Sequence, residues 1–180
     1  MKPIMPGDLI FVTSSKSIPQ KIIKWWTRLP GEDKTVATHV AAGLESSVIE
    51  ALLRVVETDS AVWIGKHKQF EVWRNNTWTS KEKQAICQRL KEYKNNWYGF
   101  WKLFLHGIDL LISKIIFKEI FLFRRLMFAD NYPICNWIYA YSVYDVLGYK
   151  FGVDPKFTEP DSMRDFVINN SDWDCVIDSD

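Results

Sequence analysis

The sequence has few cysteines, and no two of them have the spacing of a paired cysteine motif. The three are Cys87, Cys135 and Cys175, an odd number with no C-x-x-C arrangement. This pattern argues against a disulfide framework and against a zinc site built from cysteine pairs. Free thiols of this kind fit a reducing compartment.

An excess of charge of one sign is also missing. The chain carries 23 Lys and Arg against 22 Asp and Glu, a formal net charge of +1. Since nucleic-acid binding calls for a strongly basic face, no nucleic-acid partner is expected. The first residues contain no apolar run after a basic start, so no signal peptide is expected. A chain of this kind is cytoplasmic as synthesised, or is a phage or viral protein, or is delivered without a classical signal.

Long uncharged apolar runs are absent too, although residues 97–128 are crowded with large apolar side chains. Lysine, arginine and acidic residues interrupt them, and no stretch of about 18 uncharged residues exists, so a membrane-spanning helix is not expected. Three interpretations stay open for this apolar insert. It forms core helices, it offers a lipid- or acyl-binding contact with a membrane surface, or it binds a partner chain.

What the chain does have is enough apolar material for a sizeable core. Its 180 residues are 47% hydrophobic and 15% aromatic, which predicts one domain over 1–180, with the apolar helical insert at about 97–128. Strands followed by helices predict an α+β fold rather than a parallel α/β sheet. Periodicity and turn residues predict strands at 9–12, 39–44, 48–52, 54–57, 70–74 and 173–177, and helices at 14–28, 79–95, 135–147 and 161–167.

Cys135 is the first candidate for chemistry. It comes just after the break at Pro133 and within one turn of a predicted helix start. Unpaired backbone N–H groups and the positive end of the helix dipole favour a thiolate there, and the N–H of Cys135 itself could stabilise an oxyanion. The alternative is a small buried apolar side chain.

His39 and Glu50 are the candidates that could act on this thiol. His39 begins a predicted strand, where an imidazole can serve as a base, although a lone histidine is more often structural. Glu50 lies amid apolar residues of the next strand, and a hairpin would bring its carboxylate to the imidazole. The alternation of side chains along a strand equally permits Glu50 to face solvent. His67, between two lysines, is expected to be solvated, and His106 is expected to be structural.

Four short motifs in order resemble the circularly permuted NlpC/P60 papain-like proteins. This family includes the bacterial YiiX-like group and, more distantly, the lecithin:retinol acyltransferase-like enzymes. In ordinary NlpC/P60 enzymes the cysteine precedes the histidine, whereas here the histidine comes first, as in the permuted group. The resemblance runs from Gly7 to Val167, and its motifs are Gly7-Asp8-Leu9-Ile10-Phe11, Thr38-His39-Val40-Ala41, Val48-Ile49-Glu50-Ala51 and Ile134-Cys135-Asn136.

The resemblance implies a papain-like fold, with an antiparallel sheet packed against the helix that carries Cys135. It implies Cys135 as the nucleophile, His39 as the general base and Glu50 as the residue that orients His39, with no metal and no organic cofactor. Two positions depart from the family: Asn136 stands where serine is frequent, and Trp137 stands where acidic residues are common.

The implied activity is a cysteine hydrolase that cleaves an amide or ester through a thioester acyl-enzyme. Peptidoglycan fragments are the first substrate expected, which would make the chain an endopeptidase or amidase. An acyl lipid is the second, for an acyltransferase or acyl hydrolase. A third alternative is an inactive papain-like module that binds a partner, and the residues leave the choice between hydrolysis and acyl transfer open.

Overall fold

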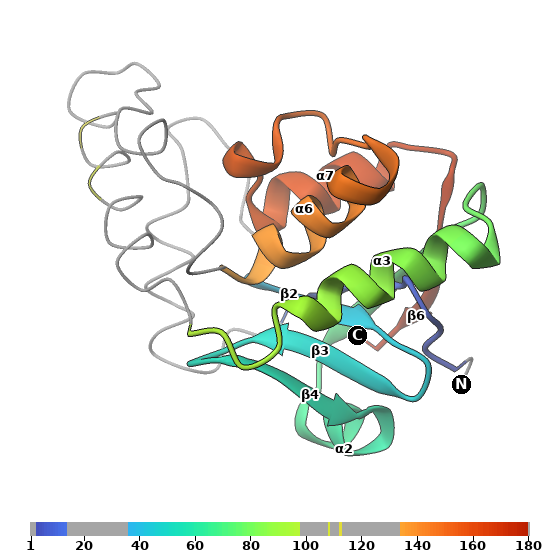
Figure 1. Ribbon diagram of the computed structural model, residues 1–180, viewed down its shortest axis with the longest axis vertical. Coiled ribbons are helices and arrows are strands. Elements are labelled where there is room, and N and C mark those ends of the chain that lie inside the picture. Colours follow the sequence, from blue (N-terminus) through green and yellow to red (C-terminus); the bar gives the residue numbers. More distant parts are fainter. Residues whose placement is uncertain (1–2, 14–35, 98–107, 109–111, 113–133, 180) are drawn as a thin grey trace.

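The computed structural model describes residues 3–13, 36–97, 108, 112 and 134–179 (Figure 1). Its centre is a six-stranded sheet in the order β4-β3-β2-β1-β5-β6, in which every neighbouring pair is antiparallel. The strands are β1 Leu9–Val12, β2 His39–Gly43, β3 Ser47–Ala51, β4 Val55–Asp59, β5 Phe70–Asn75 and β6 Trp173–Asp178.

Helices cover both sides of this sheet. Three of them lie together on one side, while the short α2 lies on the other side beside β4 (Figure 1). The predicted α+β class with an antiparallel sheet is therefore confirmed. The helices are α2 Ser60–Lys66, α3 Ser80–Glu92, α6 Cys135–Leu147 and α7 Pro160–Ile168, with a 3-10 turn η1 at Pro155–Phe157.

The pleat of β1 divides the interior into two apolar clusters. Leu9 and Phe11 belong to the larger cluster, which includes residues of α3, α6 and α7. Ile10 and Val12 belong to the smaller cluster, around Trp63 of α2. Successive side chains of a strand point to opposite faces, so a strand covered on both faces is apolar throughout. This accounts for the unbroken run of four apolar residues in β1.

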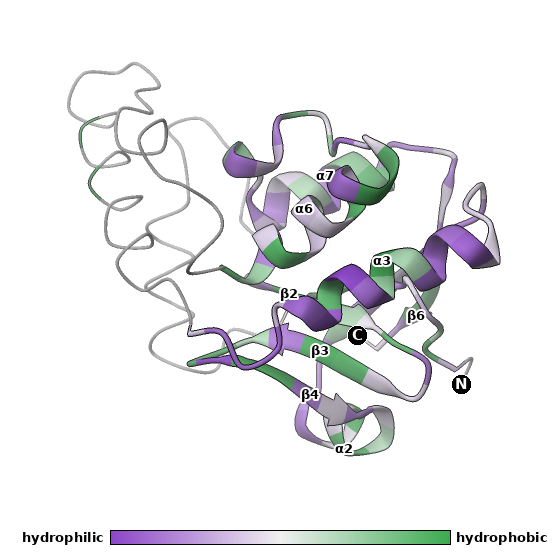
Figure 2. Ribbon diagram, viewed as in Figure 1, coloured by the Kyte–Doolittle hydropathy of each residue, from purple (hydrophilic) through white to green (hydrophobic). Residues whose placement is uncertain are grey.

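The long helix α3 begins as its sequence predicts. Thr79 and Glu82 form a capping box: the Glu82 N–H donates to Thr79 Oγ1, and the Thr79 N–H donates to the Glu82 carboxylate. Figure 2 shows hydrophilic and hydrophobic bands alternating along α3, as expected for a helix with one buried side. The helix ends at Glu92, earlier than predicted, because the chain turns at Asn95, whose φ is +71°.

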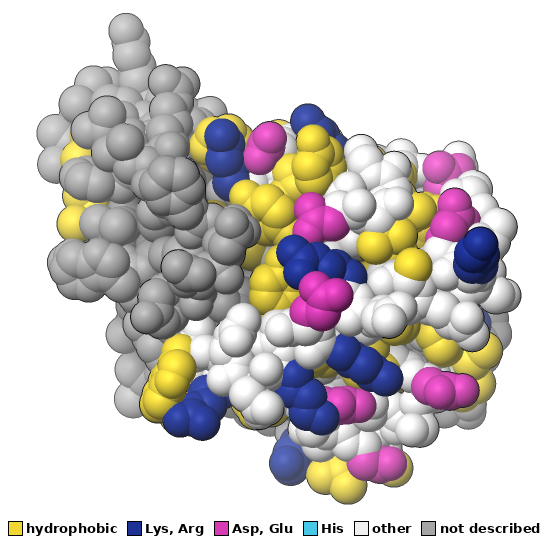
Figure 3. Space-filling model, in the orientation of Figure 1, with side chains coloured by type: hydrophobic (Ala, Val, Ile, Leu, Met, Phe, Trp, Pro, Cys, Tyr) yellow, Lys and Arg dark blue, Asp and Glu magenta, His cyan; other side chains and the backbone are white. Residues whose placement is uncertain are grey.

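Ion pairs on the surface join α3 to α6. The Arg89 guanidinium donates to Asp145 of α6 from Nε at 2.9 Å and also pairs with Glu92 of its own helix. Figure 3 shows basic and acidic side chains interspersed on this face rather than gathered by sign. Exposed pairs of this kind add little to stability, about 0.2–1 kcal/mol each.

Two elements differ from the sequence prediction. The helix α2 was not predicted, because seven residues are too short for a readable periodicity; its capping signal is Asp59, whose carboxylate accepts the N–H groups of Ala61 and Val62. The turn η1 was also not predicted. The helix predicted at 14–28 lies outside the described residues, as does the insert at 97–128 apart from Trp97, Ile108 and Ile112. Within the described ranges, no helix is both long and apolar enough to span a bilayer.

Candidate active site

His39 is the first residue of β2, at one end of the sheet. Backbone pairing with β1 sets its position: Val12 and His39 are register partners, and the Thr38 N–H donates to the Val12 carbonyl at 3.0 Å. The His39 side chain is 14% exposed, so it can be reached from solvent while most of its ring is covered.

Glu50 meets His39 across the β2–β3 hairpin. The register pairs Ala41 with Glu50, so His39, two residues before Ala41, is the diagonal neighbour of Glu50. Glu50 alternates with Ile49 and Ala51 of the larger core, and its side chain is only 4% exposed. His39 Nε2 lies 2.9 Å from Glu50 Oε2. Of the two positions that alternation permitted for Glu50, the structure has the buried one beside the imidazole.

Trp63 of α2 holds the second oxygen of the same carboxylate. Its indole Nε1–H donates to Glu50 Oε1 at 3.0 Å, and the ring is fully buried. Both carboxylate oxygens therefore have partners, which fixes the orientation of Glu50 towards His39. Sequence reasoning missed Trp63 because the helix that carries it was missed.

His67 is not the solvated residue that the sequence predicted. It closes α2, is half-buried, and stacks on Trp63 with 4.0 Å between ring centroids and an interplanar angle of 18°. Its Nδ1 lies 3.0 Å from the Trp63 carbonyl oxygen. The lysines on either side suggested a surface loop, but a ring next to a short helix can fold back onto it. His106 lies outside the described residues.

Cys135 lies within the first turn of a helix, as predicted: it is the first residue of α6, and its side chain is buried. Figure 1 shows the start of α6 next to β2, the strand that begins with His39. The helix starts from Ile134, whose carbonyl accepts the N–H groups of Trp137 at 3.1 Å and Ile138 at 3.3 Å. A hydrogen bond with the Cys135 side chain is among the causes that raise the pKa of the His39 imidazole. The three candidates are therefore connected in the order Cys135, His39, Glu50.

The connected groups change each other's ionisation. Burial acts to lower the pKa of His39, but hydrogen bonds that the imidazolium donates to Cys135 and Glu50, together with the charges of those two groups, outweigh it and raise that pKa from 6.5 to about 10. Burial acts to raise the pKa of Glu50, but the hydrogen bond and charge of His39 prevail and lower it. The site therefore favours a charged imidazolium between the sulfur and the carboxylate at neutral pH.

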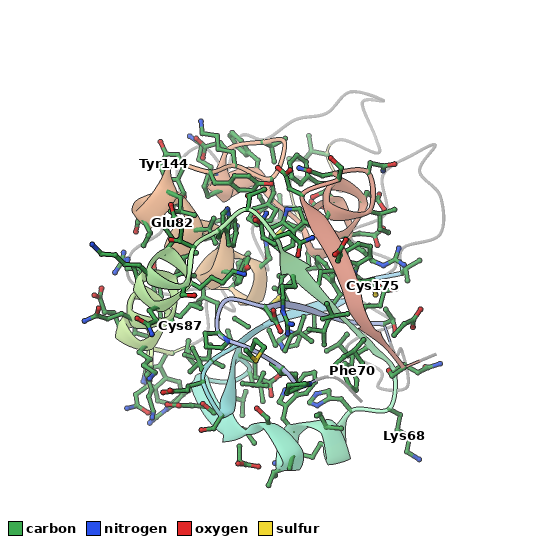
Figure 4. All side chains as sticks on the ribbon, turned by 90° about the vertical axis from the view of Figure 1, so that its right-hand side faces the viewer. Lys68, Phe70, Glu82, Cys87, Tyr144 and Cys175 are labelled. Atoms are coloured by element: carbon green, nitrogen blue, oxygen red, sulfur yellow. The ribbon has the colours of Figure 1, made fainter. Side chains whose placement is uncertain are left out.

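The other two cysteines lie in different surroundings. Cys87 is on α3 and Cys175 is on β6 (Figure 4). The buried Cys87 thiol donates to the Gly43 carbonyl at 3.6 Å, and burial raises its pKa. Cys175 is exposed; partial burial, followed by the nearby Glu71 carboxylate, raises its pKa. Neither environment favours a thiolate.

Both positions that depart from the permuted family are packed inside the protein. The Asn136 amide Nδ2 donates to the Thr158 carbonyl at 2.6 Å and to Thr158 Oγ1 at 3.0 Å. Trp137 is buried and lies edge-to-face with Tyr141, 6.0 Å between centroids. These side chains support the start of α6 from within.

Asp8 is a structural residue. Its carboxylate accepts two hydrogen bonds from the Arg74 guanidinium, both 2.8 Å long, and the N–H of Met5 at 2.7 Å. This bidentate pair is almost fully buried on the Asp8 side and joins the chain before β1 to β5.

Comparison with solved structures finds a similar fold in a protein of known structure. No family model matches the chain, and no curated protein matches it. The fold does match the crystal structure of yiiX from Escherichia coli O157:H7, assigned to DUF1105, with a TM-score of 0.63, 97% of each chain covered and 15% identity. The chain therefore has a YiiX-like fold. At this identity the likeness extends to the fold alone.

That neighbour is described as a metalloprotein, which raises the question of a metal site in this chain. Within the part of the chain that the structure describes, no group of three or more His, Cys, Asp or Glu side chains is arranged to hold a metal ion. His39 Nε2 lies 2.9 Å from Glu50 Oε2. The described donors do not fit a metal centre.

Proposed function

We propose that the protein is a papain-like cysteine hydrolase or acyl-transfer enzyme of the permuted NlpC/P60 kind. The observation that carries this proposal is the connection of three groups through one imidazole, because His39 interacts with both Cys135 and Glu50. Nucleophile, base and orienting carboxylate in this relation are the working parts of cysteine hydrolases. The YiiX-like fold and the order His39, Glu50, Cys135 along the chain support the permuted assignment.

The reaction begins from an imidazolium–thiolate pair. The Cys135 sulfur attacks the carbonyl carbon, a C–S bond forms, and the electron pair of the carbonyl moves to its oxygen. When this intermediate collapses, the C–N or C–O bond breaks and the leaving group takes a proton from His39, leaving a thioester. In this proposal the backbone N–H of Cys135, at the helix start, stabilises the oxyanion.

The second half returns the enzyme to its initial state. Neutral His39 takes a proton from water, or from an acceptor alcohol or amine, as that molecule attacks the thioester. The C–S bond breaks, the acyl group leaves on the new oxygen or nitrogen, and the thiolate faces the imidazolium again. Since Glu50 occupies Nε2, Nδ1 is the nitrogen left to exchange protons with the sulfur. No metal and no organic cofactor take part.

Two substrate classes follow from this proposal. The resemblance to NlpC/P60 enzymes favours an amide bond in peptidoglycan stem peptides. A surface feature next to Glu50 favours an acyl lipid instead. The turn after β3 leaves Leu52 48% and Leu53 69% exposed, beside Trp97 at 57%. The Arg54 guanidinium lies 3.9 Å from the centroid of the Trp97 ring, a pairing of apolar and basic groups suited to an interfacial lipid.

Mass spectrometry of trapped intermediates tests the activity and the substrate together. The wild-type protein and the Cys135→Ala variant are incubated separately with muropeptides and with phospholipids. An acyl adduct on wild-type Cys135 and none on C135A is expected, and the substrate that gives the adduct identifies the class.

A reactivity measurement with iodoacetamide is independent of the substrate. Cys135 should be alkylated faster than Cys87 and Cys175 at pH 6.5, and His39→Ala should remove that advantage. If Cys135 reacts no faster than the other two and H39A changes nothing, the enzymatic proposal fails and the inactive binding module becomes the better account.

A further inference from the structure

The start of α7 makes a long-range contact that the proposed chemistry has not used. Asp161 lies in the first turn of this helix, and its Oδ1 accepts the backbone N–H groups of Val36 at 2.9 Å and Ala37 at 3.0 Å. A carboxylate at a helix start commonly caps N–H groups of its own helix. Here it binds two N–H groups from a segment more than 120 residues away in the sequence.

Val36 and Ala37 come shortly before His39, the proposed base, in the sequence. Thr38 follows them, with both its N–H and its Oγ1 donating to the Val12 carbonyl, at 3.0 and 3.2 Å. His39 comes next, as the first residue of β2. The approach to His39 is therefore held from α7 at two residues and from β1 at the third, which leaves little freedom in where the imidazole stands.

The same turn that ends in Asp161 begins at Thr158, which contacts the nucleophile's helix. Thr158 accepts both hydrogen bonds of the Asn136 amide, through its carbonyl and its hydroxyl oxygen. Asn136 follows Cys135, and its Oδ1 lies 3.9 Å from the Cys135 sulfur. Thr158 is itself fixed, because its hydroxyl donates to the Pro155 carbonyl at 2.8 Å.

Two features make the turn between these contacts stiff. Pro160 restricts the backbone at its third position, and the Glu159 N–H donates to Ser162 Oγ at 3.0 Å. Thr158 and Asp161 are therefore the first and last residues of one short, rigid turn. Thr158 binds the residue after Cys135. Asp161 binds the two residues that precede Thr38 and His39.

We propose that this turn, residues 158–161, sets the separation between thiol and imidazole, and that Asp161 and Asn136 are positioning residues for the reaction. The inference rests on the proposed function. His39 and Cys135 lie on different elements, and proton transfer between them requires hydrogen-bond distance, where a displacement of 1 Å can cost roughly 100-fold in rate. Asp161 touches neither group and acts through the peptide groups that carry His39.

The test compares Asp161→Ala with Asp161→Asn in full-length protein carrying Cys175→Ser. Alanine removes the acceptor of both N–H groups, whereas asparagine keeps an acceptor oxygen without the charge. The control is Thr79→Ala, which removes the capping hydrogen bond of α3 and weakens the start of a helix that carries neither His39 nor Cys135. Two readouts are taken: the pH dependence of Cys135 alkylation by iodoacetamide, and the pKa of His39 by NMR titration of the imidazole.

In D161A we expect Cys135 alkylation at pH 6.5 to fall at least about tenfold, with its pH midpoint moving towards that of a free thiol near 8.5. The pKa of His39 should move from about 10 towards 6.5. D161N should stay within about threefold of wild type, because either N–H still finds an oxygen. T79A should match wild type in both readouts.

The outcomes separate this inference from the function on which it rests. If D161A behaves like T79A while H39A still abolishes the advantage of Cys135, the turn does not position the site and only this inference is overturned. Equal loss in D161A and D161N also overturns it, since charge rather than the acceptor geometry would then be responsible. If H39A has no effect either, the proposed function itself has failed.

Discussion

Two buried glutamates in this protein have nearly the same surroundings and different partners. Glu50 accepts the Trp63 indole N–H at 3.0 Å and faces His39. Glu71 accepts the Trp73 indole N–H at 2.9 Å and two hydrogen bonds from the Arg164 guanidinium, at 2.9 and 2.6 Å. Each carboxylate thus has one indole donor and one cationic partner.

The two partners differ in whether they can lose a proton. Arg164 remains charged at any pH that the protein survives, and the carboxylate beside it raises its pKa further against the effect of burial, so its pair with Glu71 joins β5 to α7 permanently. His39 can give up its proton, and its ring contacts Cys135. Under the proposed function, the same carboxylate–indole arrangement supports chemistry only at Glu50, where the partner titrates.

Replacing His39 by glutamine should have the largest effect, because it removes the difference between the Glu50 and Glu71 sites. The glutamine amide can still donate a hydrogen bond to Glu50, so the pair becomes as unable to transfer protons as Arg164 and Glu71. Turnover of the substrate identified by mass spectrometry should fall by about 10³–10⁴, the usual effect of losing a base of this type. Urea unfolding should change by less than about 1.5 kcal/mol. Turnover above a tenth of wild type would contradict the role of His39.

Removing Arg164 should affect the fold and leave the chemistry. Arg164→Ala leaves Glu71, whose side chain is 6% exposed, without its cationic partner. Breaking a buried ion pair in this way lowers the free energy of unfolding by about 3–5 kcal/mol. The measurement is the free energy of unfolding in urea. Where the variant is still folded, the ratio of Cys135 to Cys87 alkylation should equal that of wild type. A changed ratio would mean that the two glutamate sites are coupled.

The two indoles allow a matched pair of variants. Trp63→Phe and Trp73→Phe each remove one N–H donor to a buried carboxylate while keeping an aromatic ring, and each should cost about 1.5–3 kcal/mol in urea unfolding. Only W63F should change the pH profile of Cys135 alkylation, since only its carboxylate faces His39. Equal profiles in the two variants would show that Trp63 has a packing role alone.

The pH dependence of stability tests the raised pKa of His39 in the wild-type protein. Because the pKa of His39 is raised from 6.5 to about 10, its contribution to stability is complete below 6.5 and is lost as the pH rises through 10. The window from about 8.5 to 10 is the clearest, because an ordinary thiol is then also ionised in the unfolded chain. There the unfolding free energy of wild type should fall by up to about 1.4 kcal/mol per pH unit, and that of H39Q should fall less. Parallel curves for the two proteins would contradict the raised pKa.

The sequence predicts the secondary structure well where the signal is local. The strand at 9–12 follows from its apolar run, the start of α3 from Thr79 and Glu82, and the end of α6 from Gly148, whose φ is +68°. Proximity of His39 and Glu50 also follows from local information, because a short hairpin leaves few registers. Their catalytic roles stay predictions.

What could not be predicted depends on contacts between distant segments. Trp63 reaches Glu50 from a helix too short to detect, and Arg164 reaches Glu71 from 93 residues away. Asp161 looked like an ordinary helix-start residue, yet its carboxylate binds another part of the chain. Tertiary docking decides such pairings, and no sequence spacing encodes them.

The hairpin that joins His39 to Glu50 also has a consequence for the order of folding. These residues are 11 apart in sequence, so closing the loop between them costs little entropy, whereas Cys135 must be brought from far along the chain. We therefore expect His39 and Glu50 to come together before Cys135 joins them. We expect thiol pulse labelling during refolding to find Cys135 acquiring its enhanced reactivity only after the β2–β3 amides are protected from hydrogen exchange.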